Sequence, residues 1–569
     1  MIHFKQTVAE NILTFLNEAC PEHGLTNEQL CSMFEYPPDN SLGDLAFPCF
    51  KLSRIMRKAP PQIAIAIAER LKSDVIKKAE PVNGYLNIFM ADHYLADDVL
   101  SRIEAQGERY GSHRFGEGKT VVLDYASPNV AKPFHIGHLG TTVIGHSLKM
   151  LHQFAGYNCI GINHLGDWGT QFGKLIVAYR KWGSEEAVIN GGIDALVSLY
   201  VKFHAEAEKD EALNQEARNE FTKLEHHDEE NTRLWKWFID ISLKEYNVTF
   251  GQLGIEFDSY NGESFYTDKM PEQIQRMRDM NLLKLDDGAS IVDLTDYNMP
   301  PCLILKRDGS TLYPTRDIAA AVYRKRTYDF DKCIYVTSAG QSLHFAQWFK
   351  VVELMGYDWA DKLVHVPYGT VSINGEKLAT RTGNVILLKD LFASAIKKVE
   401  EIMEEKNPDL ENKAEVAEAV GVGAIVFYYL YNNRIKDINF MMEDALSFVG
   451  NTGPYAQYTY ARTCSVLEKA PAVGTAPVKI TSPEETELLK VLARFPEKVL
   501  EAIRDYEPSV ITRYIIDVCT AYNRFYHNCH ILSAEDSDVR DARIRITAAT
   551  KTTLGNAFGL VCLKKTEKI

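Results

Sequence analysis

The sequence predicts a multidomain α/β protein, with an α+β extension at the N-terminus, a doubly wound parallel sheet in the middle and an all-α bundle at the C-terminus. Short apolar strands alternate with helical patterns between residues 116 and 390, and parallel strands need such crossover helices. Almost unbroken helical periodicity after residue 390 predicts the bundle. We therefore expect domains at 1–115, 116–390 and 391–569, a normal number for 569 residues.

Composition narrows the class of protein. Apolar residues make up 46% and charged residues 25%, which is ordinary for a soluble globular chain. We find no apolar run of membrane-spanning length and no signal peptide, so we expect no membrane partner. The ten cysteines form no C-x-x-C pair, which predicts neither a metal site nor a disulfide scaffold and fits a reducing cytoplasm. The net charge of −14 argues against binding to nucleic acid, because phosphate contacts need positive charge. Local basic patches could still provide such contacts on an acidic protein.

The N-terminal extension reads as helices packed on a strand. Val8, Ile12, Phe15 and Leu16 have helical spacing, and Pro60-Pro61 opens a second helix. Residues 85–90 alternate as a strand after the Asn83-Gly84 turn. No residue here has a catalytic pattern, so the extension is predicted to bind a partner or to stabilise the chain.

The first strand–helix–strand unit spans residues 119–163. Val121 to Leu123 form a buried strand, a loop follows, and a helix from His135 buries one face before a second strand, 158–163. This crossover places a helix N-terminus at the carboxyl edge of a parallel sheet, where anionic ligands bind.

Two histidines stand at that helix start. His135 and His138 are three residues apart and share one face, and Gly137 between them leaves room for a flat ring. Imidazoles at a positive helix end can stabilise a phosphate as it gains charge. An H-x-x-H pair can also be a surface accident or a fragment of a metal site.

The rest of the middle third continues the sheet. A glycine-rich loop, 163–173, suits a small ligand, and the charge-rich stretch 184–250 reads as solvated helices of an insertion, 184–312, that also holds hairpin strands. A helix at 318–326, a strand at 333–337 and a helix at 345–355 complete the sheet.

A second cationic segment follows the sheet. Residues 372–383 combine an Asn-Gly turn with Lys377 and Arg381 on a polar loop. Mobile cations on a loop suit a triphosphate, although an ordinary surface loop has the same composition. Beyond it, 414–429 and 437–448 read as helices, and later tyrosines interleaved with Arg and Asn suit stacking on unpaired bases or packing in a core.

These segments together resemble one family. His135-Ile136-Gly137-His138 matches the HIGH signature of class I aminoacyl-tRNA synthetases, and SPNVAKPFHIGHL and GDWGTQFGKL resemble the arginyl-tRNA synthetases. The segments GDLAFPCFKLSR, VNGYLNIFM and GNTGPYAQYTYARTCSVL resemble the same family at both ends of the chain. Residues 375–383 resemble a degenerate KMSKS loop, with Thr380 where the second lysine would stand.

The resemblance implies a fold and an activity. It implies a Rossmann-like (HUP-type) catalytic domain, a C-terminal bundle that contacts the tRNA stem and anticodon, and an N-terminal extension that contacts the tRNA elbow. It implies an arginine–tRNA ligase of protein biosynthesis that uses ATP with substrate-bound Mg²⁺, arginine and tRNA, acts as a cytoplasmic monomer and activates arginine only with tRNA bound.

The resemblance also implies site residues. It assigns ATP binding and the catalytic step to His135, Gly137, His138, Lys377 and Arg381. Lys132 is expected to replace the lysine that is missing from the second loop. A guanidinium needs carboxylates and planar acceptors, which points to Asp124 and Asp317 at the sheet edge. Resemblance adds Asn129, Tyr313 and Gln341 to the arginine site. For tRNA it implies Tyr455, Gln457, Tyr514, Asn523 and Tyr526.

Some positions depart from the family pattern. Gly140 stands where arginine is usual, Pro314 interrupts the motif before Asp317, and the tail LVCLKKTEKI lacks the customary ending. Three alternatives stay open: another class I synthetase, such as the cysteinyl enzyme with its metal-ligating cysteines; a nucleotidyltransferase acting on small molecules; and an inactive paralogue that only binds tRNA.

Overall fold

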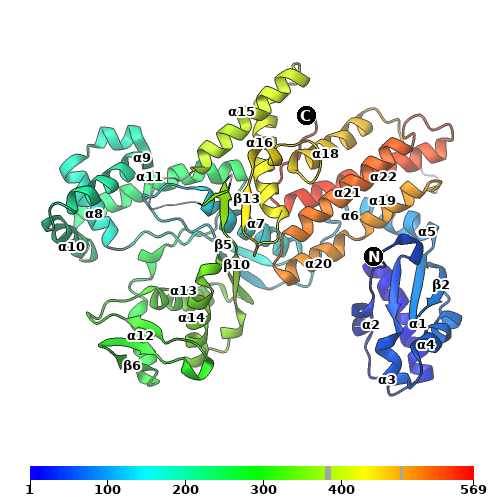
Figure 1. Ribbon diagram of the computed structural model, residues 1–569, viewed down its shortest axis with the longest axis horizontal. Helices are drawn as coiled ribbons and strands as arrows, with labels where there is room; N and C mark the ends of the chain where they lie inside the picture. Colours follow the sequence, from blue (N-terminus) through cyan, green and yellow to red (C-terminus); the bar gives the residue numbers. More distant parts are fainter. Residues whose placement is uncertain (374, 378–385, 475–477) are drawn as a thin grey trace.

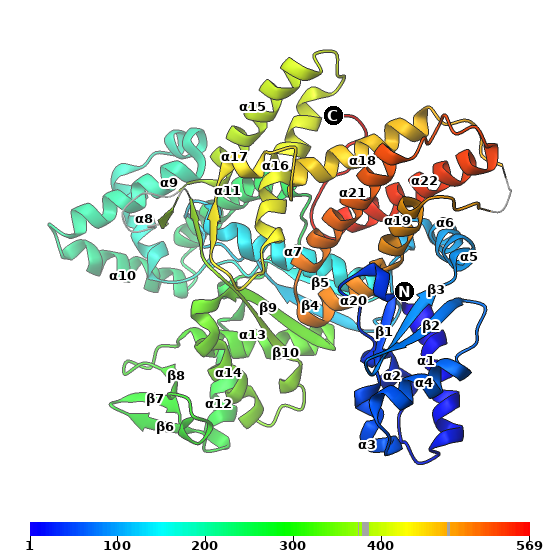
Figure 2. The same cartoon turned by 45° about the vertical axis from the view of Figure 1, so that its right-hand side comes forward.

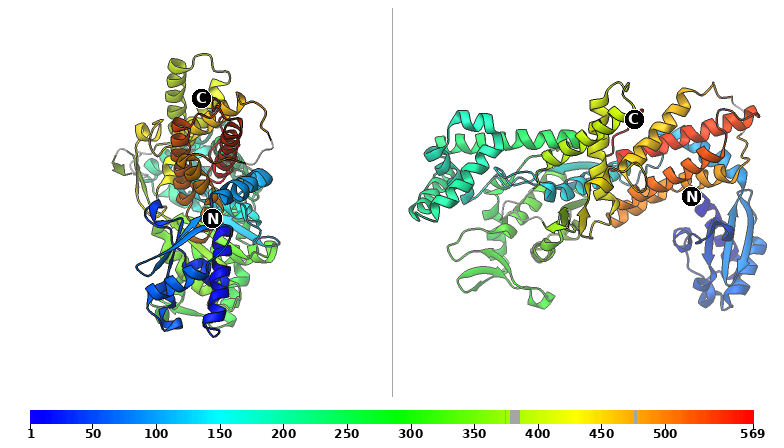
Figure 3. Two further views of the ribbon diagram at one scale, coloured as in Figure 1. Left: turned by 90° about the vertical axis from the view of Figure 1, so that its right-hand side faces the viewer. Right: turned by 45° about the horizontal axis from the view of Figure 1, so that its top comes forward.

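A computed structural model describes residues 1–373, 375–377, 386–474 and 478–569 (Figure 1). The N-terminal region, the central sheet with its insertion and the C-terminal helices form three parts of an elongated molecule, wide in one view and narrow in another (Figures 1 and 3). The predicted fold class is confirmed. The boundaries near 115 and 390 stay predictions.

The N-terminal part is a small antiparallel sheet covered by helices. Its strands lie in the order β1 (Leu45–Pro48), β3 (Tyr85–Met90) and β2 (Ile76–Val82). Helices α1 (Ile2–Ala19) and α4 (Pro60–Arg70) pack on it, with α2 (Asn27–Met33) and α3 (Ser53–Met56) beside them. Helices α5 (Asp92–Tyr94) and α6 (Ser101–Gln106) then lead toward the central sheet.

The central sheet has four parallel strands in the order β10 (Leu363–Tyr368), β9 (Lys332–Ser338), β4 (Thr120–Asp124), β5 (Asn158–Ile162). Successive side chains of β4 point to opposite faces of the sheet, and both faces are covered by helices. Val121 and Leu123 pack with α7 (Leu139–Phe154), whereas Val122 packs with α13 (Tyr313–Tyr328) and α14 (Ser342–Leu354). All four carboxyl ends therefore meet at one edge.

The insertion contributes to two lobes (Figure 1). One lobe is formed by α8 (Thr170–Trp182), α9 (Glu185–Ala207), α10 (Ala212–Glu225) and α11 (Glu229–Leu253). In the other, α12 (Met270–Asp279) and a meander of β6 (Leu283–Asp286), β7 (Ala289–Val292) and β8 (Cys302–Leu305) pack against α13 and α14. The charged faces are solvated as predicted, but the opposite faces of α8 to α11 bury a separate core that includes Phe172, Phe203 and Phe238.

The C-terminal part is a helical bundle. It contains α15 (Leu388–Lys406), α16 (Lys413–Tyr431), α18 (Gly453–Glu468), α19 (Pro483–Ala493), α20 (Phe495–Asp505), α21 (Ser509–Asn528) and α22 (Ser537–Gly559). Helix α16 is long and apolar enough to cross a membrane, which corrects the expectation that no such run exists. Two thirds of that stretch is buried in the protein, where it packs against α15, α18 and α21.

One predicted helix of the bundle is wrong. Residues 437–448 contain β13 (Ile438–Phe440), which pairs in parallel with β11 (Val371–Ile373), and only a short helix, α17 (Met442–Ala445). Ile438 and Phe440 are buried on either side of an exposed Asn439, a period of two that the apolar content had masked. This strand returns the chain to the catalytic part before the bundle resumes.

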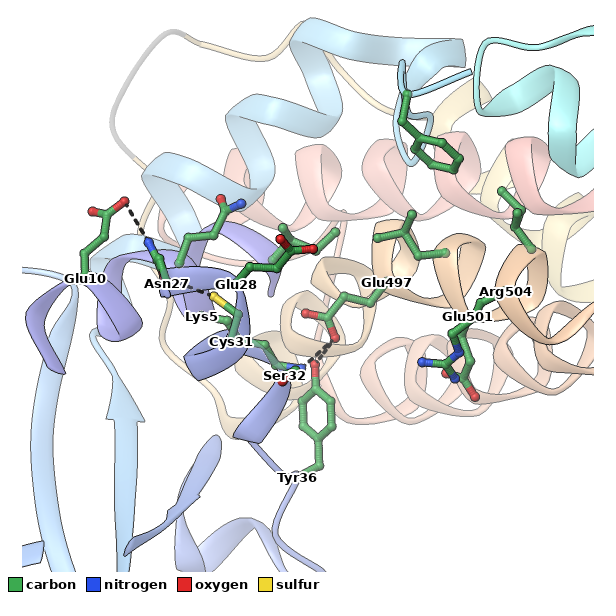
Figure 4. Close-up of a pocket in the computed structure, with 15 residues that line it drawn as sticks. Lys5, Glu10, Asn27, Glu28, Cys31, Ser32, Tyr36, Glu497, Glu501 and Arg504 are labelled. Carbon is green, nitrogen blue, oxygen red and sulfur yellow. Dashed lines mark hydrogen bonds and ion pairs between the residues drawn. The ribbon is translucent and has the colours of Figure 1, made fainter. Parts of the chain in front are cut away.

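The N-terminal part docks on the bundle below α19 and α20 (Figure 2). Tyr36 donates its hydroxyl to Glu497 Oε2 at 2.5 Å, Lys5 Nζ lies 3.1 Å from the same oxygen, and Lys490 pairs with buried Asp44 at 2.5 Å. Lys5, Tyr36 and Glu497 border a cleft of about 1040 Å³ between the two parts (Figure 4). The contacts fix where the extension sits relative to the bundle.

Candidate active site

A cavity of about 510 Å³ opens at the carboxyl edge of the sheet, where β4 ends. Elements far apart in the sequence line it: the loop after β4, the start of α7, the insertion, the start of α13 and the turn after β9. The structure brings together all five residues predicted for the arginine site, Asp124, Asn129, Tyr313, Asp317 and Gln341, and adds His138.

The two signature histidines cap the helix with their own side chains. His135 precedes a 3-10 turn, Ile136–His138, and its Nδ1 accepts the Gly137 N–H at 3.0 Å. His138 Nδ1 accepts the His135 N–H at 3.2 Å, and the two rings lie 4.0 Å apart. An Nδ1 that accepts a hydrogen bond carries no proton, so each neutral ring has its proton on Nε2.

Burial keeps these rings neutral. It lowers the pKa of His138 to about 3, with nearby His135 as a further cause, and it also lowers the pKa of His135. The site therefore offers two Nε2–H donors near neutral pH rather than two imidazolium cations. The sequence pattern predicted the pair but not its charge, which depends on burial.

The loop between β4 and the histidines is strained. Ala126, Ser127 and Ala131 have φ values of 67°, 45° and 57°, a left-handed conformation that costs non-glycine residues about 1–2 kcal/mol each. Thr141 Oγ1 accepts the Ala126 N–H at 3.1 Å, and Ser242 Oγ accepts the Ala131 N–H at 3.0 Å. Strain held in this way concentrates at ligand sites.

Helix α11 of the insertion braces the same loop. The Tyr246 hydroxyl lies 2.8 Å from the Asn129 carbonyl oxygen and 2.7 Å from that of Lys132, and it donates to these acceptors. The Lys132 side chain is left exposed beside the histidines. The sequence analysis treated α11 only as a solvated helix, because nothing in a charge-rich pattern shows which end touches a distant loop.

Asp124 is held at the floor of the cavity. Its Oδ2 lies 2.8 Å from Arg324 Nη2, and its Oδ1 accepts from the Ser127 hydroxyl at 2.9 Å. Arg324, on α13, is only 1% exposed. The sequence analysis missed this cation, since a single arginine inside a helical pattern looks like a surface residue.

Glu263 is a third carboxylate of the cavity, and the sequence analysis missed it too. Burial raises its pKa to about 7, although Arg316 Nη1 lies 2.6 Å from its Oε2. The glycine-rich loop holds it in place: Asp167 accepts from the Ser264 N–H at 2.8 Å, and the Glu263 N–H donates to the Leu165 carbonyl at 3.0 Å. The loop thus ties the insertion to the sheet edge.

Asp317 does not cap its helix. Helix α13 begins four residues earlier, at Tyr313, with Pro314 in its first turn, a position that suits proline. Asp317 Oδ2 instead lies 2.6 Å from His344 Nε2. Pro314 therefore leaves the motif intact.

The second cationic segment is only partly described. The backbone of Lys377 forms β12 (Glu376–Lys377), which pairs with β11. Arg381 lies outside the described residues, so its predicted role stays a prediction.

Comparison with known proteins decides the family. Residues 99–442 match the model of the class I (R) tRNA synthetase catalytic domain, 456–569 match the DALR anticodon-binding domain, and 6–90 match the arginyl-tRNA synthetase N-terminal domain. The chain belongs to the arginyl-tRNA synthetase family.

Relatives support this along the whole chain. The arginine–tRNA ligase of Alkaliphilus metalliredigens is 49% identical, and that of Clostridium perfringens 48%, each with 100% of both chains covered. The arginyl-tRNA synthetase of Thermus thermophilus has the same fold, with a TM-score of 0.82, 23% identity and coverage of 99% and 100% of the two chains.

Gly140 departs from the family pattern for a visible reason. A Cβ built there would lie 2.2 Å from the Tyr429 hydroxyl oxygen and 3.0 Å from a ring carbon of Tyr368. Tyr429 belongs to α16 and Tyr368 lines the cavity at the end of β10. In this arginyl-tRNA synthetase chain, glycine lets the bundle touch the helix that carries His138.

A groove of about 1070 Å³ lies where the region that matches the anticodon-binding domain, 456–569, meets residues 407–419. It runs between α16, α18, α21 and the C-terminal tail. The Arg462 guanidinium sits between the rings of Tyr458 and Tyr526, at 5.0 and 4.8 Å from their centroids, and both tyrosines are exposed. This groove presents aromatic faces and a cation together, which suits unpaired bases.

The five residues predicted for tRNA divide in the structure. Tyr526 lines the groove, and behind it the Asn523 amide donates to the Tyr455 hydroxyl at 2.9 Å and accepts from Arg462. Gln457 and Tyr514 are buried, and they bond backbone carbonyls inside the bundle. Both side chains make packing contacts here, and a helical aromatic or amide pattern does not show which face turns inward. Their contact with tRNA stays a prediction.

Proposed function

We propose that this chain is an arginine–tRNA ligase that activates L-arginine with ATP and transfers it to the 3′-terminal adenosine of its tRNA. The observation that carries the proposal is the cavity itself. Three carboxylates gather at the sheet edge beside two histidine donors and a strained, braced loop. A cationic substrate and an anionic one would meet at this edge.

The activation step is an in-line attack by the arginine carboxylate on the α-phosphorus of ATP, which expels pyrophosphate. The substrate supplies the nucleophile, so the protein positions the reactants and stabilises charge. His135 and His138 donate Nε2–H hydrogen bonds to phosphate oxygens that become more negative. Lys377 and Lys132 neutralise the leaving pyrophosphate, to which Mg²⁺ comes bound with ATP as part of the substrate.

Lys132 takes the place of the lysine missing from the second loop. Its exposed side chain follows a loop fixed by Tyr246, beside the histidines. Lys132→Ala should therefore lower the aminoacylation rate nearly as much as Lys377→Ala. A Lys132→Ala variant as active as the wild type would refute this role for Lys132.

Arginine is selected by its planar, permanently charged guanidinium. Asp317 and Asp124 provide negative charge, Tyr313 and Gln341 provide in-plane acceptors, and Asn129 holds the α-amino group. Lysine is a point charge and cannot make the paired contacts. Asp317→Ala should raise the KM for arginine at least about tenfold more than the KM for ATP, because it removes a charge-assisted hydrogen bond.

The tRNA spans the molecule. The groove at Tyr458, Arg462 and Tyr526 accepts anticodon bases, and the N-terminal part contacts the elbow. Ten free thiols are compatible with a cytoplasmic enzyme, and we propose that it works as a monomer, which sedimentation of the purified chain would test.

Arginine-dependent exchange of pyrophosphate into ATP, measured with and without arginine tRNA, tests the whole proposal. Exchange that requires both arginine and tRNA is the expected result. Exchange with another amino acid would refute the substrate. No exchange from a chain that still binds tRNA would identify an inactive paralogue.

A further inference from the structure

All three carboxylates of the cavity already have a basic partner in the protein. Asp124 and Glu263 each lie against an arginine, at 2.8 and 2.6 Å. Asp317 alone lies against a histidine, His344, at 2.6 Å. A guanidinium offers a fork of N–H donors and a fixed charge, whereas one ring nitrogen of an imidazole meets a single carboxylate oxygen. Asp317 is therefore the one of these three carboxylates that is held by a ring nitrogen.

The geometry leaves half of Asp317 open. His344 Nε2 contacts only Oδ2 of the carboxylate. The Asp317 side chain is 26% exposed and that of His344 28%, and both line the cavity. His344 is fixed at the start of α14, packed edge-on against Phe345. A ring that donates Nε2–H to Oδ2 thus holds the carboxylate in one orientation and leaves Oδ1 for a substrate.

We propose that His344 is a positioning residue for arginine: its ring holds Oδ2 of Asp317 so that Oδ1 faces the substrate guanidinium. The inference rests on the proposed function of the cavity. A carboxylate that is free to rotate would lose part of the paired, in-plane geometry that a guanidinium requires. Fixing one oxygen of Asp317 should therefore favour the binding of arginine over that of ATP.

Neighbouring groups make their contacts elsewhere. Arg316 lies 2.6 Å from Glu263. His365 stacks on Phe345 and lies 2.8 Å from the Thr337 hydroxyl, so it takes no part in holding Asp317. Among the described residues, His344 makes the side-chain contact that orients the Asp317 carboxylate.

The test measures kcat, the KM for arginine and the KM for ATP in aminoacylation at saturating tRNA. His344→Ala should raise the KM for arginine about tenfold, because Asp317 loses the hydrogen bond that orients it, and should change the KM for ATP less than about twofold. His344→Gln keeps a side-chain N–H donor, so its KM for arginine should lie close to the wild-type value.

A control variant separates positioning of Asp317 from a general loss of structure. His365→Gln removes a neighbouring imidazole that does not touch Asp317, and its KM for arginine should match that of the wild type. A wild-type KM for arginine in His344→Ala would overturn the proposal, and so would equal increases in the two KM values. Absence of any aminoacylation by the wild type would instead refute the proposed function.

Discussion

Replacing His138 tests whether this residue has two separable roles, one in capping the helix start and one in binding the substrate. Its Nδ1 caps the helix start by accepting the His135 N–H at 3.2 Å, and its Nε2–H is left for the substrate. Asparagine places an oxygen near Nδ1, so it can accept the same N–H, but it has nothing at Nε2. Glutamine places a donor near Nε2, and at the third position of a capping box it can also reach back to the His135 N–H. Alanine loses both.

The magnitudes follow from these contacts. Loss of a side-chain cap costs about 1 kcal/mol of stability. Loss of one preorganised donor to developing charge typically costs about 10²–10³ in kcat, or roughly 3–4 kcal/mol. We therefore expect His138→Asn to unfold in urea like the wild type but to lose about 10²–10³ in kcat, and His138→Ala to lose both activity and about 1 kcal/mol. The KM for tRNA should stay near the wild-type value in each variant.

Aminoacylation kinetics and urea unfolding of the three variants check this prediction. A His138→Asn enzyme within about threefold of the wild-type kcat would refute the donor role. Equal stability of the Ala and Asn variants would refute the cap. Because the pKa of His138 is about 3, its titration should leave kcat unchanged above about pH 5.

Three further predictions concern stability and tRNA. Burial lowers the pKa of His146 and of His152 to about 4. The unfolded chain, in which both side chains have the ordinary pKa of 6.5, therefore binds more protons at acid pH, and the free energy of unfolding should fall by about 2 kcal/mol per histidine as the pH drops to 5. In urea unfolding, His152→Gln should show a smaller fall over the same pH range. Gly140→Ala should cost about 1–3 kcal/mol in the same assay because its Cβ would meet the Tyr429 hydroxyl, and an unchanged unfolding midpoint would show that α16 can move away. Arg462→Ala should raise the KM for tRNA about tenfold and leave the KM for arginine at saturating tRNA unchanged. Equal increases in both KM values would show that the groove does not bind tRNA.

Local sequence patterns specify the layers and the chemistry of the sheet edge. The unbroken apolar run Val121-Val122-Leu123, followed by a loop and a helical pattern, predicts a strand with both faces covered. The polar residues that follow each strand, Asp124 among them, must then meet at the carboxyl edge. Local patterns were sufficient here because strand, helix and turn preferences act over a few neighbouring residues.

The partners of those residues are set by contacts between distant parts of the chain. Arg324, Glu263 and His344 come from three separate segments, and no local pattern distinguishes them from surface residues. The same holds for β13, whose partner strand β11 lies 67 residues earlier in the chain, as in the pair Ser372↔Asn439. Which charges meet, and which are buried, depends on contacts between distant segments, and those contacts set the protonation states and orientations on which the proposed chemistry depends.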